Sequence, residues 1–195
     1  MVMLRFCTAN SNLILLALFF AWSGTLGYQG IPTAGAANML DSNEGEASPD
    51  PRFTDNGDGT VTDNRTGLIW LQNANVTGVR TWADALADVE NLNRDGTMNG
   101  TFAGDKSNGG SHQKDWRLPN RNELSSLTDS SNNNPALPPG YSSFFSGVQS
   151  DSYWSSDTLK GGIAYAWVVN LSDYGIMDTA NKTDTCYVWP VRAGK

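Results

Sequence analysis

The chain has 195 residues, of which 39% are hydrophobic and 17% are charged, and its formal net charge is −7 at pH 7. A negative surface repels phosphate polymers, so this charge excludes nucleic acid as a partner. A polyanionic glycan would need a local basic patch, and the only basic cluster is Lys114, Arg117 and Arg121. We interpret this cluster as solvated or as paired with Asp115 and Glu123, rather than as a binding patch.

Residues 1–36 have the pattern of a secretory signal peptide. Arg5 precedes the uninterrupted apolar run from Leu13 to Trp22. This run is too short for a spanning helix, which needs roughly 20 residues, but it fits the apolar core of a signal peptide. Cleavage after Ala36 satisfies the small-residue rule, and a cut within residues 24–27 is the alternative. We therefore expect an exported protein, periplasmic or secreted to the cell surface, without a stable transmembrane span. An uncleaved membrane anchor is the other possibility.

Residues 37–51 have the composition of a disordered linker. Nothing large and apolar follows Leu40, and small or polar residues dominate. Such a segment cannot bury enough surface to offset the entropy lost on ordering. The folded domain is therefore expected over residues 52–195, which hold six of the seven tryptophans.

The domain opens with short apolar islands around Phe53, Val61 and Trp70. They are separated by Asn56-Gly57, Asp58-Gly59 and Thr66-Gly67. These dipeptides allow the positive φ of tight turns and predict three short antiparallel strands. The acidic turn fails the calcium-loop spacing counted from Asp55, because Thr60 stands at the sixth position and Thr66 at the twelfth. No metal site is expected.

An amphipathic helix is predicted from Thr81 to about Asn93. Thr81 is a suitable N-cap, and Asp84 occupies the third helical position. The expected core face is Trp82, Ala85, Leu86, Val89 and Leu92, and the expected polar face is Asp84, Asp88 and Glu90.

A long polar segment, residues 93–114, follows, with Met98 and Phe102 as its apolar anchors. Loops longer than about 12–15 residues tend to be functional or disordered, so this segment is a candidate ligand-facing element. It contains His112, the only histidine. A solvated loop residue is preferred for His112 over a metal ligand or a catalytic base.

The segment from Asp115 to Leu124 combines an extended stretch, a stop and a helix start. Trp116 and Leu118 alternate with polar residues, which predicts that they point into the core. Pro119 ends the extended stretch because it lacks an amide hydrogen and restricts the residue before it. Asn120 is then a natural N-cap, and Glu123 three positions later can complete a capping box. A helix through Leu124 and Leu127 is implied.

The C-terminal part reads as an irregular run, residues 130–139, followed by strands. Phe144 and Phe145 are expected in the core. Strands are predicted over residues 165–171, 176–178 and 186–192, with a turn at Tyr174-Gly175. Cys186 is expected to be buried, or else to pair between chains. Two helices flanked by short, mostly antiparallel strands predict an α+β domain.

Six motifs, in this order, resemble the Lcl C-terminal domain family (DUF1566): DGTVTDNRTGLIW, TWADALADVENL, DWRLPNRNEL, YWSSD, AWVVNL and YVWPVR. The resemblance covers essentially the whole domain. It implies a C-type-lectin-like fold related to the formylglycine-generating and sulfatase-modifying enzymes. In the collagen-like adhesin after which the family is named, the domain is associated with trimers and with glycosaminoglycan binding.

The chain also departs from its relatives. Family members often carry a cysteine pair where this chain has Val89 and Pro190, which suggests a disulfide replaced by packing. The enzymatic relatives use paired cysteines, which Cys186 alone does not supply. The calcium-dependent sugar motifs of animal lectins are absent as well. Neither oxidase chemistry nor calcium-bridged sugar binding is therefore carried over from the resemblance.

The resulting hypothesis is a noncatalytic binding module that recognises a glycan or an envelope or host surface protein, with no cofactor. A structural or assembly protein of the cell envelope is the alternative, and a degenerate enzyme-like fold that regulates a partner is a third. The oligomeric state stays open. The ligand-binding candidates are Tyr153, Trp154, Tyr174, His112, Lys114 and Arg121, although core packing is preferred for Trp154. The expected structural anchors are Trp70, Trp82, Trp116, Leu118, Pro119, Glu123 and Trp167.

Overall fold

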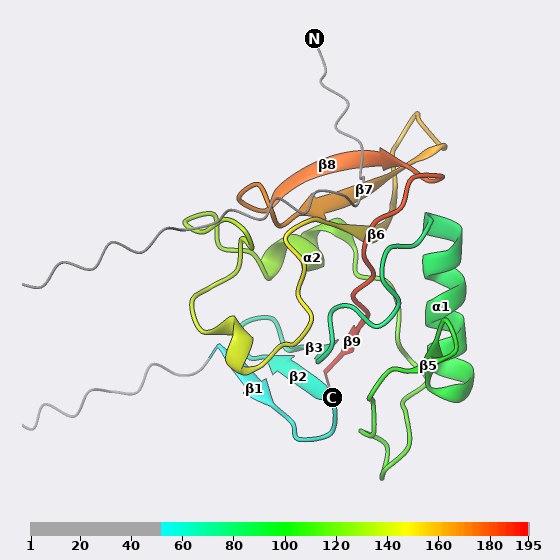
Figure 1. Cartoon of the computed structure of the whole chain (residues 1–195), viewed down its shortest axis with the longest axis vertical. Helices are drawn as coiled ribbons and strands as arrows, with labels where there is room; N and C mark the ends of the chain where they lie inside the picture. The colour runs from blue at the N-terminus through cyan, green and yellow to red at the C-terminus, as the bar shows by residue number, and fades with distance from the viewer. Residues whose placement is uncertain (1–51, 195) are drawn as a thin grey trace, which may run out of the picture. The chain divides into compact units, whose positions relative to one another are not determined.

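The computed structural model describes residues 52–194 (Figure 1), so the predicted signal peptide (1–36) and linker (37–51) lie outside the described residues. The elements in chain order are β1 (Phe53–Asp55), β2 (Thr60–Asp63), β3 (Leu68–Leu71), α1 (Trp82–Asp95), β4 (Thr97–Met98), β5 (Thr101–Phe102), α2 (Arg121–Ser126), the 3-10 helix η1 (Tyr141–Ser143), β6 (Ser152–Thr158), β7 (Tyr165–Asn170), β8 (Ile176–Asn181) and β9 (Val191–Ala193). Two α-helices accompany antiparallel sheets, which confirms the α+β prediction for this part of the chain. Within it, no helix has the length and apolar character needed to cross a bilayer.

The first sheet has the strand order β1-β2-β3-β9, with every pair antiparallel. The three predicted N-terminal strands are confirmed, and Gly57, Gly59 and Gly67 between them adopt positive φ. β9 returns from the far end of the chain to pair with β3, as Figure 1 shows, and places Val191 opposite Trp70. The two ends of the domain are therefore held in one sheet.

The second sheet has the order β6-β7-β8, again antiparallel. The predicted strand over residues 186–192 is wrong in its extent, because only Val191–Ala193 belongs to a ladder. Before it, Cys186 and Tyr187 form single bridges with Arg80 and Tyr153. This segment passes from one partner to the next, and Pro190 has no amide hydrogen with which to continue a ladder.

Helix α1 begins and ends as local chemistry requires. The Thr81 side chain accepts a hydrogen bond from the Asp84 amide, and Gly96 closes the helix with φ of 77°. Val89, where the family resemblance places a cysteine, packs in the core. The expectation of a wholly polar opposite face is wrong for Asp88, which is 2% exposed.

The buried Asp88 carboxylate is satisfied by two donors. Arg80 Nε lies 2.7 Å from its Oδ2, and the Asn99 amide donates to its Oδ1 at 2.9 Å. A buried carboxylate persists only when it is paired and hydrogen-bonded, so Asp88 serves to join α1 to the segments on either side of it.

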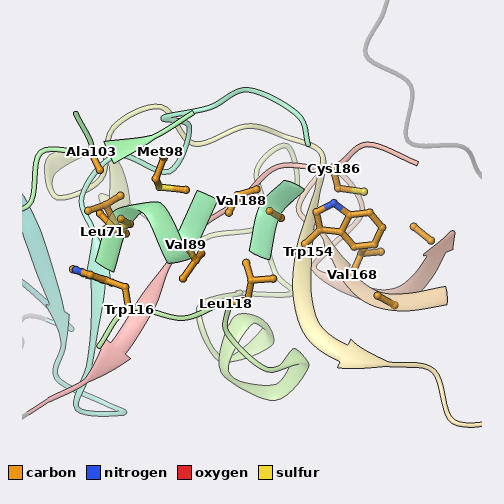
Figure 2. Packing of buried hydrophobic residues seen from close by; sticks show 14 residues of the cluster. Leu71, Val89, Met98, Ala103, Trp116, Leu118, Trp154, Val168, Cys186 and Val188 are labelled. Carbon is orange, nitrogen blue, oxygen red and sulfur yellow. The ribbon is translucent and has the colours of Figure 1, made fainter. Parts of the chain in front are cut away.

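Two hydrophobic clusters form the core. One surrounds α1, and Figure 2 shows Val89 and Leu118 between Trp116 at one end and Trp154 with Cys186 at the other. The predictions that Trp116, Leu118 and Cys186 are buried are confirmed. The second cluster is aromatic and contains Trp70, Phe145, Tyr153 and Trp189.

The long polar segment is ordered around one buried carboxylate. Asp105 is fully buried and accepts hydrogen bonds from the Ser107 amide and hydroxyl, the Gln113 amide and Trp116 Nε1. Burial opposes the charged form, but these hydrogen bonds lower the pKa of Asp105 below its ordinary value. The expected second anchor, Phe102, is 56% exposed, because the β4–β5 hairpin turns Met98 rather than Phe102 into the core.

We predict that Gly59→Ala destabilises the domain much more than Gly57→Ala. Both glycines have positive φ, which costs another residue roughly 1–2 kcal/mol. A Cβ at Gly59 would also lie 2.0 Å from the Gly104 carbonyl oxygen, whereas a Cβ at Gly57 meets nothing within 4 Å. The overlap should add about 1–3 kcal/mol to the loss in the free energy of unfolding, measured in urea. Equal losses in the two variants would contradict the close approach of residues 59 and 104.

Candidate functional site

The candidate site is a cleft of about 420 Å³ beside the first turn of α2. Residues 120–122, residues 157–160 and Trp167 line it, and we call it the Trp167 cleft. Its residues come from α2, from the end of β6 with the loop that follows, and from the middle of β7. Three segments that are distant in the sequence therefore meet here.

The start of α2 forms as the sequence predicts. Asn120 Oδ1 accepts from the Glu123 amide at 2.8 Å, and Glu123 Oε2 accepts from the Asn120 amide at 2.8 Å, which completes the predicted capping box. Two further hydrogen bonds join this turn to β6. The Arg121 amide donates to Asp157 Oδ2 at 2.9 Å, and the Ser156 amide donates to the Pro119 carbonyl at 2.8 Å.

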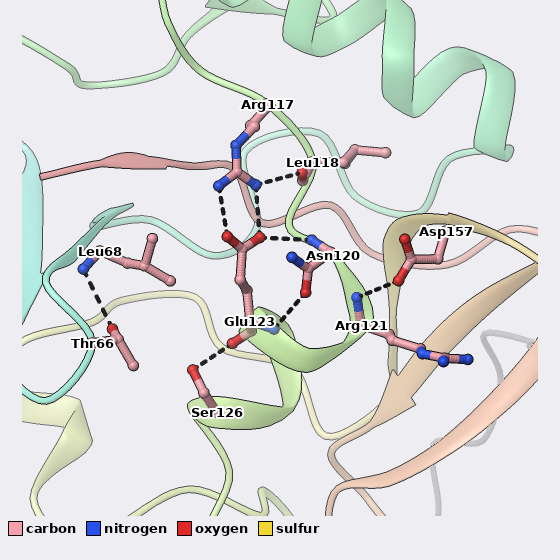
Figure 3. Close-up of polar contacts among 9 residues, drawn as sticks. All are labelled: Thr66, Leu68, Arg117, Leu118, Asn120, Arg121, Glu123, Ser126 and Asp157. Carbon is pink, nitrogen blue, oxygen red and sulfur yellow. Dashed lines mark hydrogen bonds and ion pairs between the residues drawn. The ribbon is translucent and has the colours of Figure 1, made fainter.

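Glu123 is also held by Arg117 in a two-pronged ion pair, as Figure 3 shows. The nitrogen–oxygen distances are 2.7 and 2.6 Å. The Arg117 hydrogen bonds, and secondarily the Asn120 amide, lower the pKa of Glu123 below its ordinary value, while partial burial opposes them. Glu123 therefore stays ionised and engaged near neutral pH. A carboxylate in this state is a poor general acid or base.

Arg121 and Trp167 form the centre of the cleft. The Arg121 guanidinium lies over the Trp167 ring, 4.4 Å from its centroid. Trp167 is only partly buried, because it lies on the face of β7 opposite to Ala166 and Val168, which are core residues. Trp167, which the sequence suggested as a structural anchor, borders the cleft with its indole.

Two of the ligand-binding candidates are buried, so the ligand role suggested for Tyr153 is wrong and the core packing preferred for Trp154 is confirmed. Tyr153 and Trp154 are both fully buried, with no surface for a ligand. The Tyr153 hydroxyl accepts from the Gln149 amide, Trp154 Nε1 donates to the Arg80 carbonyl, and burial raises the pKa of Tyr153. Tyr153 and Trp154 lie in the first half of β6, where this strand contacts the segment of residues 186–189. Their side chains pack in the two core clusters.

The other candidates lie apart from the Trp167 cleft, except for Arg121. Tyr174 is 49% exposed at the β7–β8 turn, and Lys114 is exposed in the long polar segment. His112 is partly buried against the end of α1, where a Cβ at Gly96 would lie 2.9 Å from its Nδ1. Its Nε2 is buried and has no hydrogen-bond partner within residues 52–194.

The predicted basic cluster does not form a single patch. Arg117 pairs with Glu123, as the sequence suggested, and Arg121 covers Trp167. Sequence reasoning missed Asp157, Lys160 and Asn122 as cleft residues. Asp157 ends the YWSSD motif, so the motif was visible although its role was not. In the described part of the chain, no three His, Cys, Asp or Glu side chains are grouped as metal ligands would be.

A second cleft, of about 360 Å³, lies on the other side of the same turn. It is lined by Thr66, Leu68, Asn120, Asn122, Glu123 and Ser126. We call it the Thr66 cleft. Asn120 and Asn122 line both clefts.

In the comparison with known protein families, the family model described as the Lcl C-terminal domain matches residues 59–192, a range that contains every residue lining the two clefts. No curated protein matches the chain.

We predict that Glu123→Gln lowers the free energy of unfolding by about 1–2 kcal/mol at pH 7, because it replaces the two-pronged charged pair with Arg117 by a neutral amide, whose single oxygen can still accept from the Asn120 amide. The folded pKa of Glu123 lies below its unfolded value, so its stabilisation is present above the unfolded pKa of about 4.3 and is lost as pH falls through the folded value. In urea titrations the difference between wild type and variant should therefore shrink as the pH falls below about 4.3. Asp115→Asn, at an exposed carboxylate, is the control and should change stability by less than about 0.5 kcal/mol. A constant difference across this pH range would contradict the assignment.

Proposed function

We propose that this chain, which belongs to the Lcl C-terminal domain family, is a noncatalytic module that binds a carbohydrate in the Trp167 cleft. In this proposal the domain has the C-type-lectin-like arrangement that its family resemblance implies, and it acts outside the cytoplasm in an adhesin-like role. The export part of the proposal depends on the signal-peptide pattern of residues 1–36.

The Trp167 cleft is the observation that carries the proposal. A sugar presents an apolar face of C–H groups and a rim of hydroxyl groups. A partly exposed indole can pack against the C–H face, and amide, carboxylate and ammonium groups can hydrogen-bond with the hydroxyl groups. Trp167 supplies the indole, which the Arg121 guanidinium covers on one face and which otherwise borders the cleft, while Asn122, Asp157 and Lys160 supply hydrogen-bonding groups around it.

The state of the ionisable groups supports a noncatalytic role. Asp157 Oδ2 is held by the Arg121 amide, and Glu123 is held by Arg117 and the Asn120 amide. Cys186 is 1% exposed and lies in the core cluster around α1. Nucleophilic or acid–base chemistry needs an accessible group poised for proton transfer, and these groups are engaged or buried.

We expect Trp167→Ala to weaken glycan binding by at least about tenfold, because truncation of an aromatic anchor costs about 2 kcal/mol or more. A glycan array with the purified protein identifies the bound sugar, and isothermal titration calorimetry then gives the dissociation constants. Tyr174→Ala is the matched control, because Tyr174 is an exposed aromatic that lines neither cleft. Tyr174→Ala should bind as wild type does.

Both variants must keep the unfolding midpoint of wild type for this comparison to hold. Trp154→Ala is unsuitable as a probe, since it would empty part of the core. Absence of binding to every array sugar by the wild-type protein would overturn the proposed function. If Trp167→Ala and wild type bound the sugar with equal affinity, the ligand would not bind in the Trp167 cleft.

A second candidate function is assembly with another protein chain. Tyr174, Ile176 and Met177 lie next to one another in sequence and are 49%, 50% and 36% exposed. They precede and begin β8, which pairs only with β7 within residues 52–194. An exposed edge strand with apolar side chains is a template for pairing with another strand.

Ile176→Lys tests this second function, because a lysine on an edge strand opposes pairing. If copies of the chain associate through β8, native mass spectrometry should show a multimer for wild type and a monomer for Ile176→Lys. Ile163→Lys makes the same change at a residue that is 84% exposed outside β8, and it should leave the multimer intact. A monomeric wild-type protein would argue against self-assembly through this edge.

A further inference from the structure

We infer that the Trp167 cleft and the Thr66 cleft are two subsites of one groove that binds a linear, neutral oligosaccharide. This inference depends on the proposed carbohydrate function and adds to it the length and charge of the ligand. Its basis is the wall between the two clefts, which is the first turn of α2 and which both clefts share.

The two clefts are adjacent and share Asn120 and Asn122 as lining residues. Each cleft alone, about 420 or 360 Å³, is near the lower end of the roughly 300–1,000 Å³ typical of small-molecule sites. A single sugar ring would fill only one of the two clefts. It would then use only one side of the wall that Asn120 and Asn122 form between them. A chain of linked rings that crosses over this wall would occupy both.

The shared wall carries hydrogen-bonding capacity that the fold does not use. Asn120 Oδ1 is occupied by the Glu123 amide, which leaves its two N–H donors for another partner. Asn122 is exposed, and its side chain makes no hydrogen bond to another residue of the described chain. Two amide side chains at the crossing point can therefore bind the hydroxyls and ring oxygens of consecutive sugar units.

The Thr66 cleft itself is suited to an uncharged ligand. Its one ionised residue, Glu123, is neutralised by the two-pronged pair with Arg117. Beyond Asn120, Asn122 and Glu123, its lining is the hydroxyl residues Thr66 and Ser126 and the apolar Leu68. A negatively charged sugar would find no unpaired cation in this lining, and the net charge of −7 opposes a polyanion as a whole. The Thr66 cleft and the net charge therefore favour a neutral chain, and Arg121, Lys160 and Asp157 give the Trp167 cleft charges of both signs.

The experiment measures how affinity depends on chain length. The probes are cellulose-, chitin- and starch-derived oligosaccharides of two, four and six units, titrated calorimetrically into the purified full chain. With both subsites in use, the six-unit sugar of the bound series should be at least about tenfold tighter than its two-unit sugar, which corresponds to about 1.4 kcal/mol from the added contacts. A bulky residue in the Thr66 cleft should abolish this ratio.

Thr66→Trp is that variant, and Thr66→Phe is a smaller filler should the tryptophan lower the unfolding midpoint. Thr66 is exposed in the turn before β3, so either side chain can occupy the cleft without entering the core. The six-unit to two-unit affinity ratio should fall to about one, since the longer sugar loses its second subsite. Thr101→Trp, at an exposed residue that lines neither cleft, is the control and should keep the wild-type ratio.

The outcomes separate this inference from the proposed function. Binding that is independent of length, or a Thr66→Trp protein with the wild-type ratio, overturns the single groove and leaves the Trp167 cleft as a site for a short sugar. No binding of any of the three series at any length overturns the neutral oligosaccharide, and with an empty glycan array it overturns the carbohydrate function as well.

Discussion

The site depends on the ion pair and the hydrogen bond that the Glu123 carboxylate makes. This carboxylate accepts both prongs of the Arg117 guanidinium and the Asn120 amide, so it determines where α2 begins and how that turn is oriented. The other end of this short helix is held by Arg52 and Arg65, which both donate to the Ser126 carbonyl. A helix of six residues is marginal by itself, and these side chains stabilise it from both ends.

This arrangement decides which polar groups remain for a ligand. Once α2 is in place, the Arg121 amide reaches Asp157 and the Arg121 guanidinium covers Trp167. The charged groups of Glu123 and Arg117 are already paired with each other within the fold. The amides of Asn120 and Asn122 are left at the surface between two clefts. Such a surface is suited to recognition rather than chemistry, which is the basis of the proposed function.

Local features of the fold were predictable from the sequence, and the site was less so. The caps at Thr81 and Asn120 and the burial of Trp116 depend on residues within a few positions of one another. Whether a C-terminal aromatic side chain is buried or exposed depends on which segments pack over it. Trp154 and Trp167 lie on adjacent, paired strands, yet one is fully buried and the other borders a cleft. The residues beside each tryptophan do not say which face of its strand is covered, because that depends on segments distant in the sequence.

By itself the sequence determined the domain class, the two helices with their caps, the three N-terminal strands and the family. Each of these follows from turn chemistry, side-chain periodicity or ordered motifs that act over short distances. Only the tertiary structure decided that β9 closes the first sheet, that Asp105 orders the long polar segment, and that Arg121, Asp157 and Trp167 meet. The physical reason is that the β9 pairing and the Arg121 contacts join residues dozens of positions apart, whose approach depends on how the sheets and α2 pack. The Asp105 contacts span up to 11 positions of a segment that has no helix or strand periodicity to predict them.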